Sequence, residues 1–408
     1  MSRVRSWPLT TTCIFSLALA AAGPALAQTT PAPAPVPTAT PTALNFSGLI
    51  FGSYNYQLRT TPAPLAGQVD NAFILDRAYL TFRMPAGDRT SIRITTDIYP
   101  TTEATSSAYT IRAKYAYLQY DAPKYSNGAA VMGRIGILQN VVIEHIESFW
   151  PRYLSATPID RAGYFTASDV GLAGQLTLPN RMGELYATIV NGPSYTARER
   201  DRFKDFAVRL SLTPLANTTA SPLLKSVTLT AWGYKGATAS AFVNGGAGQL
   251  GAIGEALDRS RAGVFVGLKD PRLVLGGEFA QRHEDGETGA NTIASPRGLA
   301  GTTGRVLSAF TVVRPLAFAT ASGTSPFGLV ARYDHVTPTA ETMNVLLGGV
   351  VPSPSNAYHT VIAGLFYDLS QKAQLALDYQ ESLASPNGLS NAPPAPAKGY
   401  YAHFVVNF

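Results

Sequence analysis

The chain has a single cysteine among its 408 residues, Cys13, and it lies in the N-terminal stretch. An exported protein without further cysteines cannot depend on disulfide bonds, so it needs a large hydrogen-bonded framework instead. Charged residues are also scarce, because Asp, Glu, Lys and Arg make up 14% of the chain against about a quarter in an ordinary soluble domain. The imbalance of 32 basic against 26 acidic residues is too small to predict a nucleic-acid partner.

Long hydrophobic runs are missing as well. After residue 27, no apolar run approaches the roughly 20 residues that a membrane-spanning helix needs. Aromatic residues, in contrast, make up 10% of the chain, and 20 of them are tyrosines. Low charge, many aromatic residues and no spanning helix are typical of a protein that contacts lipid through alternating strands.

The N-terminus has the pattern of an export signal. Arg3 and Arg5 precede the short apolar core "CIFSLALAAA", and "ALA" offers a small-residue cleavage site before Gln28. A permanent membrane anchor would need a longer apolar stretch. We therefore expect a cleaved signal peptide over residues 1–27, a Pro/Ala/Thr-rich linker over 28–44 and one folded domain over 45–408.

From Asn45 onward the sequence shows runs of roughly ten residues with weak alternation, separated by turn signals. The connections between these runs are alternately short, as in "PAGD", and long, as in Gly236 to Asp258. This parity predicts an all-β fold: a transmembrane antiparallel β-barrel of about 16 strands, with long extracellular loops and short periplasmic turns. A soluble β-sandwich, the alternative, lacks such parity. The expected strands start near Asn45, Asn71, Thr90, Thr110, Gly128, Ser168, Glu184, Asp205, Leu223, Arg259, Pro271, Thr303, Ser325, Ala357, Gln371 and Lys398.

The final nine residues, "YYAHFVVNF", read as a strand with one apolar face. Tyr400, Ala402, Phe404, Val406 and Phe408 alternate with the remaining residues. We expect this face to contact lipid and the strand to close the barrel against the first strand. The terminal aromatic pattern of Tyr400, Phe404 and Phe408 resembles the signal that the outer-membrane barrel-assembly machinery recognises.

Basic residues alternate with apolar ones in the expected barrel wall. In "SIRITTDI", Ile92, Ile94 and Ile98 face out if Arg93 faces in, because an outward Arg would cost about 2–4 kcal/mol at mid-bilayer. These arginines either pair with inward acids and stiffen the wall, or leave the lumen net positive and favour anions. The same reasoning places inward Arg77, Arg83, Arg93, Arg134, Arg209, Arg261, Arg282, Arg305 and Arg332, and the acids Asp97, Glu278, Asp334 and Asp378.

The connection from Leu138 to Ala167 is too rich in large apolar residues for a loop that extends into water. A wide barrel needs something in its lumen to restrict flow, and this loop folded inward would provide it. Alternatively, the loop packs on the rim or on a neighbouring subunit. The residues that we expect at the constriction are Glu144, Glu147, Trp150, Arg152 and Tyr153.

In "ARERDRFKD", four bases recur at every second residue: Arg198, Arg200, Arg202 and Lys204. If the stretch is extended, they line one side at intervals of about 6.5–7 Å. Such a ladder would offer an entering anion successive contacts. Alternatively, this is a solvated loop whose alternating charges cancel.

No pattern in the sequence predicts a metal site, a cofactor or an enzyme. The five histidines lack metal-ligand spacing, and the nearest candidate cluster is "EHIE" at 144–147. The Gly-rich "NGGAGQLG" is not followed by the Lys-Ser/Thr pair of a phosphate-binding loop. An outer-membrane enzyme would need a Ser/His or Asp/His set at one rim.

Several stretches resemble the phosphate-selective porin family in order and spacing. They are "FILDRAYLTF" (73–82), "GRIGILQNVVIEHIESFW" (133–150) with "DVGLAGQL" (169–176), "YATIVNG" (186–192) and "KDFAVRLSLTP" (204–214). The resemblance implies a sixteen-stranded, trimeric channel in the cell outer membrane of a Gram-negative-type envelope.

These observations together predict a porin: a passive diffusion channel for small hydrophilic solutes, with a mild preference for anions such as phosphate. The expected partners are outer-membrane lipid, the assembly machinery, the solutes and two further copies of the chain. The alternative is a structural or adhesive barrel with an occluded lumen.

Overall fold

A computed structural model describes residues 43–58, 71–101, 108–199, 201–239, 256–288, 298–344, 349–351, 357–384 and 398–408. Residues 42–408 form one compact unit, distinct from residues 1–41. The expected signal peptide and all of the expected linker before Ala43 lie outside the described residues. Within the described parts of the chain, no helix is long and apolar enough to cross a membrane.

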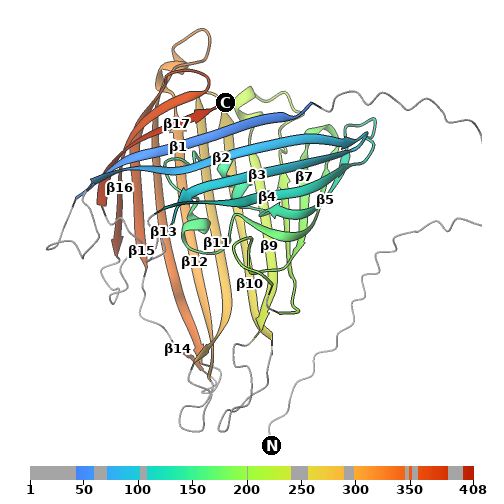
Figure 1. The fold of residues 1–408 in the computed structure, drawn as a ribbon. Helices are drawn as coiled ribbons and strands as arrows, with labels where there is room; N and C mark the ends of the chain where they lie inside the picture. Colours follow the sequence, from blue (N-terminus) through green and yellow to red (C-terminus); the bar gives the residue numbers. More distant parts are fainter. Residues whose placement is uncertain are drawn as a thin grey trace, which may run out of the picture. The chain divides into compact units, whose positions relative to one another are not determined.

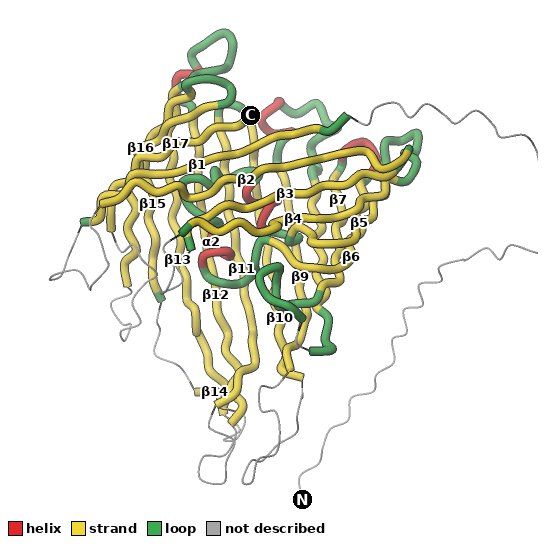
Figure 2. The backbone as a smooth tube through the Cα atoms, viewed as in Figure 1, coloured by secondary structure: helices red, strands yellow, loops and turns green. Residues whose placement is uncertain are grey.

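The described strands form one continuous antiparallel sheet that closes on itself into a barrel (Figures 1 and 2). Sixteen strands pair with their sequence neighbours around the wall, and a three-residue strand, β14 (Gly349–Val351), pairs with the end of β13. The sixteen are β1 (Asn45–Gln57), β2 (Asn71–Gly87), β3 (Thr90–Pro100), β4 (Tyr109–Asp121), β5 (Ala130–Gln139), β6 (Ser168–Thr177), β7 (Gly183–Val190), β8 (Asp205–Leu212), β9 (Thr228–Ala239), β10 (Ala256–Asp270), β11 (Leu273–Thr288), β12 (Gly298–Val313), β13 (Phe327–Asn344), β15 (Tyr358–Asp368), β16 (Ala373–Ala384) and β17 (Lys398–Asn407).

The last strand closes the barrel, as the sequence predicted. β17 pairs with β16 on one side and with β1 on the other, so that Phe404 lies opposite Leu375 and Gly52. Tyr400, Phe404 and Phe408 are exposed on the outer face, and Tyr401, His403 and Val405 are buried on the inner face. This closure confirms the predicted closed antiparallel barrel of sixteen strands, because it leaves neither β1 nor β17 as an open edge.

The alternation of side chains gives each strand one inner and one outer face. In β8, Ala207, Arg209 and Ser211 are buried in the barrel interior, whereas Phe206, Val208 and Leu210 are exposed on the outside. The outer faces of the other strands carry a similar set of exposed Leu, Val, Phe and Tyr side chains. The arrangement places charged side chains such as Arg209 inside and leaves an apolar belt outside.

Short elements lie in the connections: α1 (Ile143–Glu147), α2 (Pro158–Arg161), η1 (Pro179–Arg181), α3 (Pro222–Lys225) and η2 (Pro315–Phe318). The prediction that the ninth strand starts near Leu223 was wrong. Ser221 caps α3 by accepting a hydrogen bond from the Leu224 amide, and Pro222 occupies the first helical position, which suits proline. β9 therefore begins only at Thr228.

Register shifts interrupt the regular pairing of neighbouring strands at several places in the described sheet. The register between β3 and β4 shifts between Thr95 and Thr96, and that between β12 and β13 shifts between Thr303 and Arg305. The prediction that Arg305 faces inward was wrong. Its side chain is exposed on the outer face with Leu307, in regular alternation with the inward-facing Val306, because the extra residues of the second shift lie in β13, between Thr337 and Glu341.

Candidate functional site

The connection between β5 and β6, residues 140–167, runs through the barrel interior, and we call it the inner segment. Three wall residues on distant strands donate hydrogen bonds to its backbone carbonyls. Arg209 of β8 donates to Val141, Arg332 of β13 donates to Ala156 at 2.7 Å, and Gln380 of β16 donates to Leu154 at 2.8 Å. The inner segment therefore crosses the interior, as expected for a loop folded inward.

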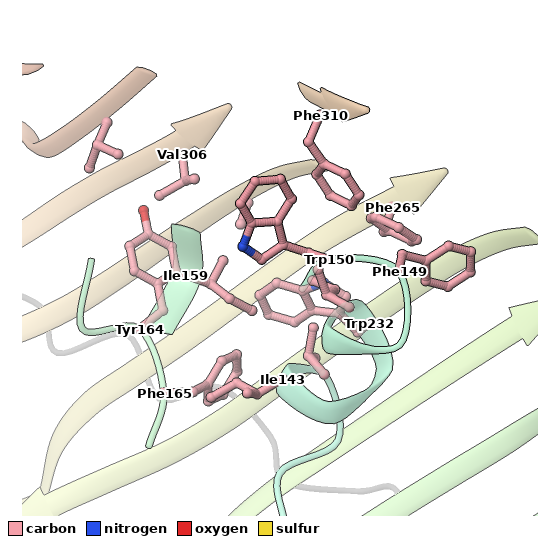
Figure 3. Close-up of a cluster of buried hydrophobic side chains, with 14 of the residues drawn as sticks. Ile143, Phe149, Trp150, Ile159, Tyr164, Phe165, Trp232, Phe265, Val306 and Phe310 are labelled. Atoms are coloured by element: carbon pink, nitrogen blue, oxygen red, sulfur yellow. The ribbon is translucent and has the colours of Figure 1, made fainter. Parts of the chain in front are cut away.

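Apolar packing holds the inner segment against one side of the wall (Figure 3). The ring of Trp150, only 1% exposed, lies 5.3 Å from that of Phe310 on β12, and Phe149 lies 5.0 Å from Phe265 on β10. Burying each large side chain of this kind contributes about 1.5–3 kcal/mol. Further fully buried members from the segment are Val141, Val142, Ile143, Ile146, Ile159 and Tyr164.

Local hydrogen bonds fix the shape of the inner segment. The Asn140 side-chain oxygen accepts from the amides of Val142 and Ile143, at 2.9 and 3.3 Å, just where α1 begins. The indole nitrogen of Trp150 donates to the Ser155 carbonyl at 2.8 Å, which satisfies its one polar atom within the apolar cluster. These contacts explain how a segment with little regular structure keeps one conformation.

The opposite side of the inner segment carries charge. Arg152 pairs with Glu147 and, at 3.0 Å, with Asp160. Burial raises the pKa of Glu147, and the nearby cations of Arg152 and Lys114 oppose that rise. Burial, assisted by the Arg209 charge, lowers the pKa of His145 to about 3, so its ring is neutral at physiological pH and bonds Thr230 Oγ1 at 2.8 Å.

Facing this charged side is a group of cations and tyrosines on β2–β5 that we call the basic–aromatic wall. The Arg93 guanidinium lies 4.7 Å from the centre of the Tyr115 ring, and Lys114 Nζ lies 4.0 Å from that of Tyr79. Its members are Arg77, Arg93, Arg112, Lys114, Arg134, Tyr79, Tyr99, Tyr115 and Tyr117, and each cation lies over at least one of the tyrosine rings.

The five cations of this wall differ in their acidic partners. Arg77 and Arg112 share one carboxylate, that of Asp97, at 3.0 and 3.1 Å. Among the described residues, no acid lies within 4 Å of Arg93, Lys114 or Arg134, which contact Thr95, tyrosine rings, Gln119 and Gln139 instead. The basic–aromatic wall therefore carries more positive charge than its ion pairs neutralise.

Sequence reasoning placed Arg77, Arg93 and Arg134 inward, and the structure shows them there. It missed Arg112 and Lys114. Lys114 and Tyr115 are adjacent, yet both are buried, at 5% and 2% exposure, because the register shift at Thr95/Thr96 turns both toward the interior. In "IRAKYAY" the alternation changes phase: residues 112 and 114 face inward, and so do residues 115 and 117. This change of phase in the sequence could have indicated the extra residue.

The basic–aromatic wall and the inner segment enclose a cavity of about 460 Å³. All five residues predicted for the constriction, Glu144, Glu147, Trp150, Arg152 and Tyr153, line it. From the wall come Arg93, Lys114, Tyr79 and Tyr115, and one end is bordered by Ser47, Asn407 and Phe408 at the rim with the short turns. The structure thus brings the five predicted constriction residues together with one of the predicted wall arginines, Arg93.

Other inward arginines have structural partners. Arg209 pairs with Glu184, Arg261 with Glu284, and Arg332 forms a fully buried pair with Asp334 at 2.7 Å. Arg282 lies near the carbonyls of Ala162 and Gly163 of the inner segment, at 3.4 Å each. On this side of the barrel the arginines agree with the first of the two alternatives given above. They pair with inward acids, which stiffens the wall, and they hold the inner segment.

Arg261 also borders a second, smaller cavity of about 190 Å³, next to Tyr164 and Phe165 of the inner segment. There Arg259 pairs with Asp205 at 3.1 Å. The charges of Arg259 and Arg261 in this cavity face those of Asp169 and Asp205. It therefore lacks the positive excess of the basic–aromatic wall.

The predicted ladder occupies the loop before β8. Arg200 lies outside the described residues, and Arg198, Arg202 and Lys204 are exposed. The backbone bends at Asp201 and Arg202, where the Asp201 carboxylate accepts from the Phe203 amide at 2.8 Å. Lys204 pairs with Glu199 at 2.7 Å. The even spacing that an extended stretch would give is therefore absent between residues 201 and 204.

Among the residues that the structure describes, no group of three or more His, Cys, Asp or Glu side chains is placed to hold a metal ion. The closest acid–histidine contact inside the barrel, His403 with Asp378 at 2.7 Å, is buried at 4% and 0% side-chain exposure. It faces neither of the two cavities described above.

Comparison with known proteins supports the fold. No family model and no curated protein matches the sequence. Similar solved structures include the outer membrane channel DcaP of Acinetobacter baumannii (12% identity, 90% of this chain and 97% of that chain, TM-score 0.56) and an anion-selective porin from Comamonas acidovorans (10% identity, 90% and 100%, TM-score 0.54). A third is the trimer form of OmpT, an outer membrane protein of Vibrio cholerae (10% identity, 90% and 99%, TM-score 0.53). At these identities the likeness establishes a shared architecture: this chain has the closed sixteen-stranded barrel fold of porins.

Proposed function

We propose that the protein is an outer-membrane porin, a passive channel for small hydrophilic solutes with a mild preference for anions. The observation that carries the proposal is the placement of the inner segment. It packs by its apolar side on the wall around β8–β13 and presents charged side chains to the cavity beside the basic–aromatic wall. A closed barrel whose interior holds a charged passage is suited to solute diffusion.

The outer surface supports a location in a membrane. Exposed apolar side chains such as Phe206, Val264, Leu307 and Leu377 cover the outside of the barrel, which in water would be a large aggregating surface. In a bilayer this surface is favourable, and the closed sheet leaves no unpaired backbone edge facing lipid. The predicted export signal directs the chain to such a membrane.

The anion preference follows from the charges of the passage. Arg93, Lys114 and Arg134 have no acid within 4 Å among the described residues, whereas Glu147 on the opposite side is already paired with Arg152. The local excess of positive charge is small. It can still favour anions, because solutes pass close to these side chains and the charges interact through a medium less polar than water. Phosphate is one candidate anion, as the resemblance to phosphate-selective porins suggests.

We also propose that the protein is a homotrimer inserted by the barrel-assembly machinery. The trimer form of the Vibrio cholerae protein supports the first part. The exposed aromatic residues Tyr400, Phe404 and Phe408 on the closing strand support the second.

Liposome swelling tests the channel function. Folded protein reconstituted into liposomes should admit arabinose, glucose and larger sugars at rates that fall with solute size, whereas heat-denatured protein should admit none. One observation supports the alternative, an occluded structural barrel: an apolar cluster fills part of the interior. Liposomes that hold correctly folded protein yet do not swell in any of these sugars would contradict the porin proposal.

A further inference from the structure

The cavity beside the basic–aromatic wall combines cations with apolar surface. Arg93 and Lys114 border it on one side. Around them lie the rings of Tyr79, Tyr115 and Trp150. The remaining apolar lining comes from Leu49, Phe51, Pro151 and Val405.

Lys114 is the least satisfied of these cations. It is 5% exposed, it has no acid within 4 Å among the described residues, and its ammonium group lies over two tyrosine rings, at 4.0 and 5.3 Å. A cation–ring contact compensates only part of the cost of removing an ammonium group from water. A solute carboxylate would supply the missing counter-charge.

The acids on the opposite side do not supply it fully. Glu147 and Asp160 both pair with Arg152, so two carboxylates share this one guanidinium. Glu144 is the other carboxylate that lines the cavity, against Arg93 and Lys114 together. Neither Arg93 nor Lys114 has an acid within 4 Å among the described residues, so a solute carboxylate in the cavity can contact both directly.

The apolar lining favours a solute that carries apolar surface as well as negative charge. A bare inorganic anion would use the cations but would leave the aromatic and aliphatic surfaces in contact with water. A flat apolar body would cover those surfaces, at about 25 cal/mol per Å² of apolar area removed from water. At about 460 Å³, the cavity falls within the size range of pockets that hold small organic molecules.

We propose that this cavity is a binding site for small organic anions that join a carboxylate to a flat apolar body, such as aromatic monocarboxylates. The carboxylate binds Lys114 and Arg93, and the ring lies against Trp150 and the side chains of Leu49 and Val405. The inference deepens the proposed porin function, because it names the class of solute that the passage retains on its way through.

Two measurements on the folded, detergent-purified protein test the inference with benzoate as the probe. Isothermal titration calorimetry should show benzoate binding at least tenfold tighter than inorganic phosphate, which lacks the ring, and than benzamide, which lacks the charge. In planar bilayers, benzoate should reduce the potassium chloride conductance at concentrations where phosphate and benzamide have no effect. Lys114→Gln should weaken benzoate binding about tenfold, because a charge-assisted contact is lost, and Lys124→Gln, at an exposed position in the β4–β5 turn, should not.

Each outcome decides the inference. Equal binding of benzoate and phosphate would overturn it in favour of a site for bare anions, and equal binding of benzoate and benzamide would reduce it to an apolar pocket. If Lys114→Gln fails to fold, Arg93→Gln serves instead, and unchanged benzoate affinity in a folded variant would also overturn it. Conductance without benzoate binding refutes this inference alone, whereas benzoate binding without conductance refutes the porin function alone.

Discussion

Phe408, the last residue, closes over Gly48 at the start of the first strand. The Gly48 amide donates to the Phe408 carbonyl at 2.9 Å, and the Phe408 amide donates to the Gly48 carbonyl at 3.0 Å. The Phe408 ring occupies the space that a side chain at Gly48 would need, and it lies 5.7 Å from the ring of Phe46. The first and last strands of the barrel are thus joined by a pair of backbone hydrogen bonds and by an aromatic ring that packs over a glycine.

This relationship predicts that a side chain at Gly48 acts like the loss of Phe408. In Gly48→Val, the new Cβ overlaps the ring and forces it off the closing strand. We expect less assembled barrel in the outer membrane, and a smaller fraction that migrates faster unboiled than boiled on a denaturing gel. Gly174→Val is the matched control, because no atom lies within 4 Å of a Cβ placed there. Equal assembly of the two variants, or normal levels of a Phe408 deletion, would count against the closing role.

The placement of the inner segment predicts that shortening it widens the passage. A variant that replaces the residues between Val141 and Tyr164 by a short Gly/Ser linker loses the ring of Trp150 and the charged side that faces the basic–aromatic wall. Single-channel conductance should rise by a factor of two or more, because flow depends on the narrowest cross-section. A matched variant that shortens the 214–220 turn at the rim should conduct as the wild type does. Unchanged conductance in a folded, shortened protein would show that the inner segment does not limit flow.

The raised pKa of Glu147 predicts a pH dependence of selectivity. A carboxyl group with a raised pKa takes up its proton at a higher pH than usual, so lowering the pH toward 5 removes this negative charge from the cavity before an ordinary glutamate is neutralised. The anion preference should therefore increase as the pH falls from 7.5 to 5. The His145 ring, with a pKa of about 3, stays neutral across this range.

Zero-current potentials in a salt gradient at the two pH values check this prediction. Glu147→Gln should already show the stronger anion preference at pH 7.5 and should lose most of the pH response. An equal pH response in Glu147→Gln and in the wild type would assign the effect to other groups.

The two sets of basic residues predict different effects on selectivity. Arg93→Gln with Arg134→Gln should shift the zero-current potential toward cations, most strongly at low salt, because these side chains lie in the interior without an acid within 4 Å among the described residues. Arg198→Gln, Arg200→Gln and Arg202→Gln together should change it less, since Arg198 and Arg202 are exposed and the backbone bends between Arg202 and its neighbours. A larger shift in the triple variant would restore the ladder as the main determinant.

Much of the barrel could be predicted from the sequence, because alternation and turn residues act locally. The starts of β1, β2, β3, β6, β8 and β17 agree with the expected residues. The ninth strand was misplaced because Ser221 and Pro222 begin a short helix, a signal that was present in the sequence but overlooked.

The candidate site was less predictable. Lys114 was missed because a single extra residue in β4 reverses the inward and outward faces, and sequence alternation does not show where that residue lies. Arg305 was misjudged because the cost of an outward arginine was given more weight than its alternation with Val306. The ion pairs that divide the wall arginines into paired and unpaired sets join residues on different strands, as Arg209 and Glu184 do. Such pairs depend on register, which no local pattern specifies.

Single-channel recording in a planar bilayer tests the central claim most directly. The account predicts stepwise, ohmic conductance from protein that migrates as a folded barrel, and a zero-current potential in a potassium chloride gradient that shows chloride to be the more permeant ion. Folded protein that inserts without conductance would contradict the account and favour an occluded barrel, and a cation-selective channel would contradict the role assigned to the basic–aromatic wall.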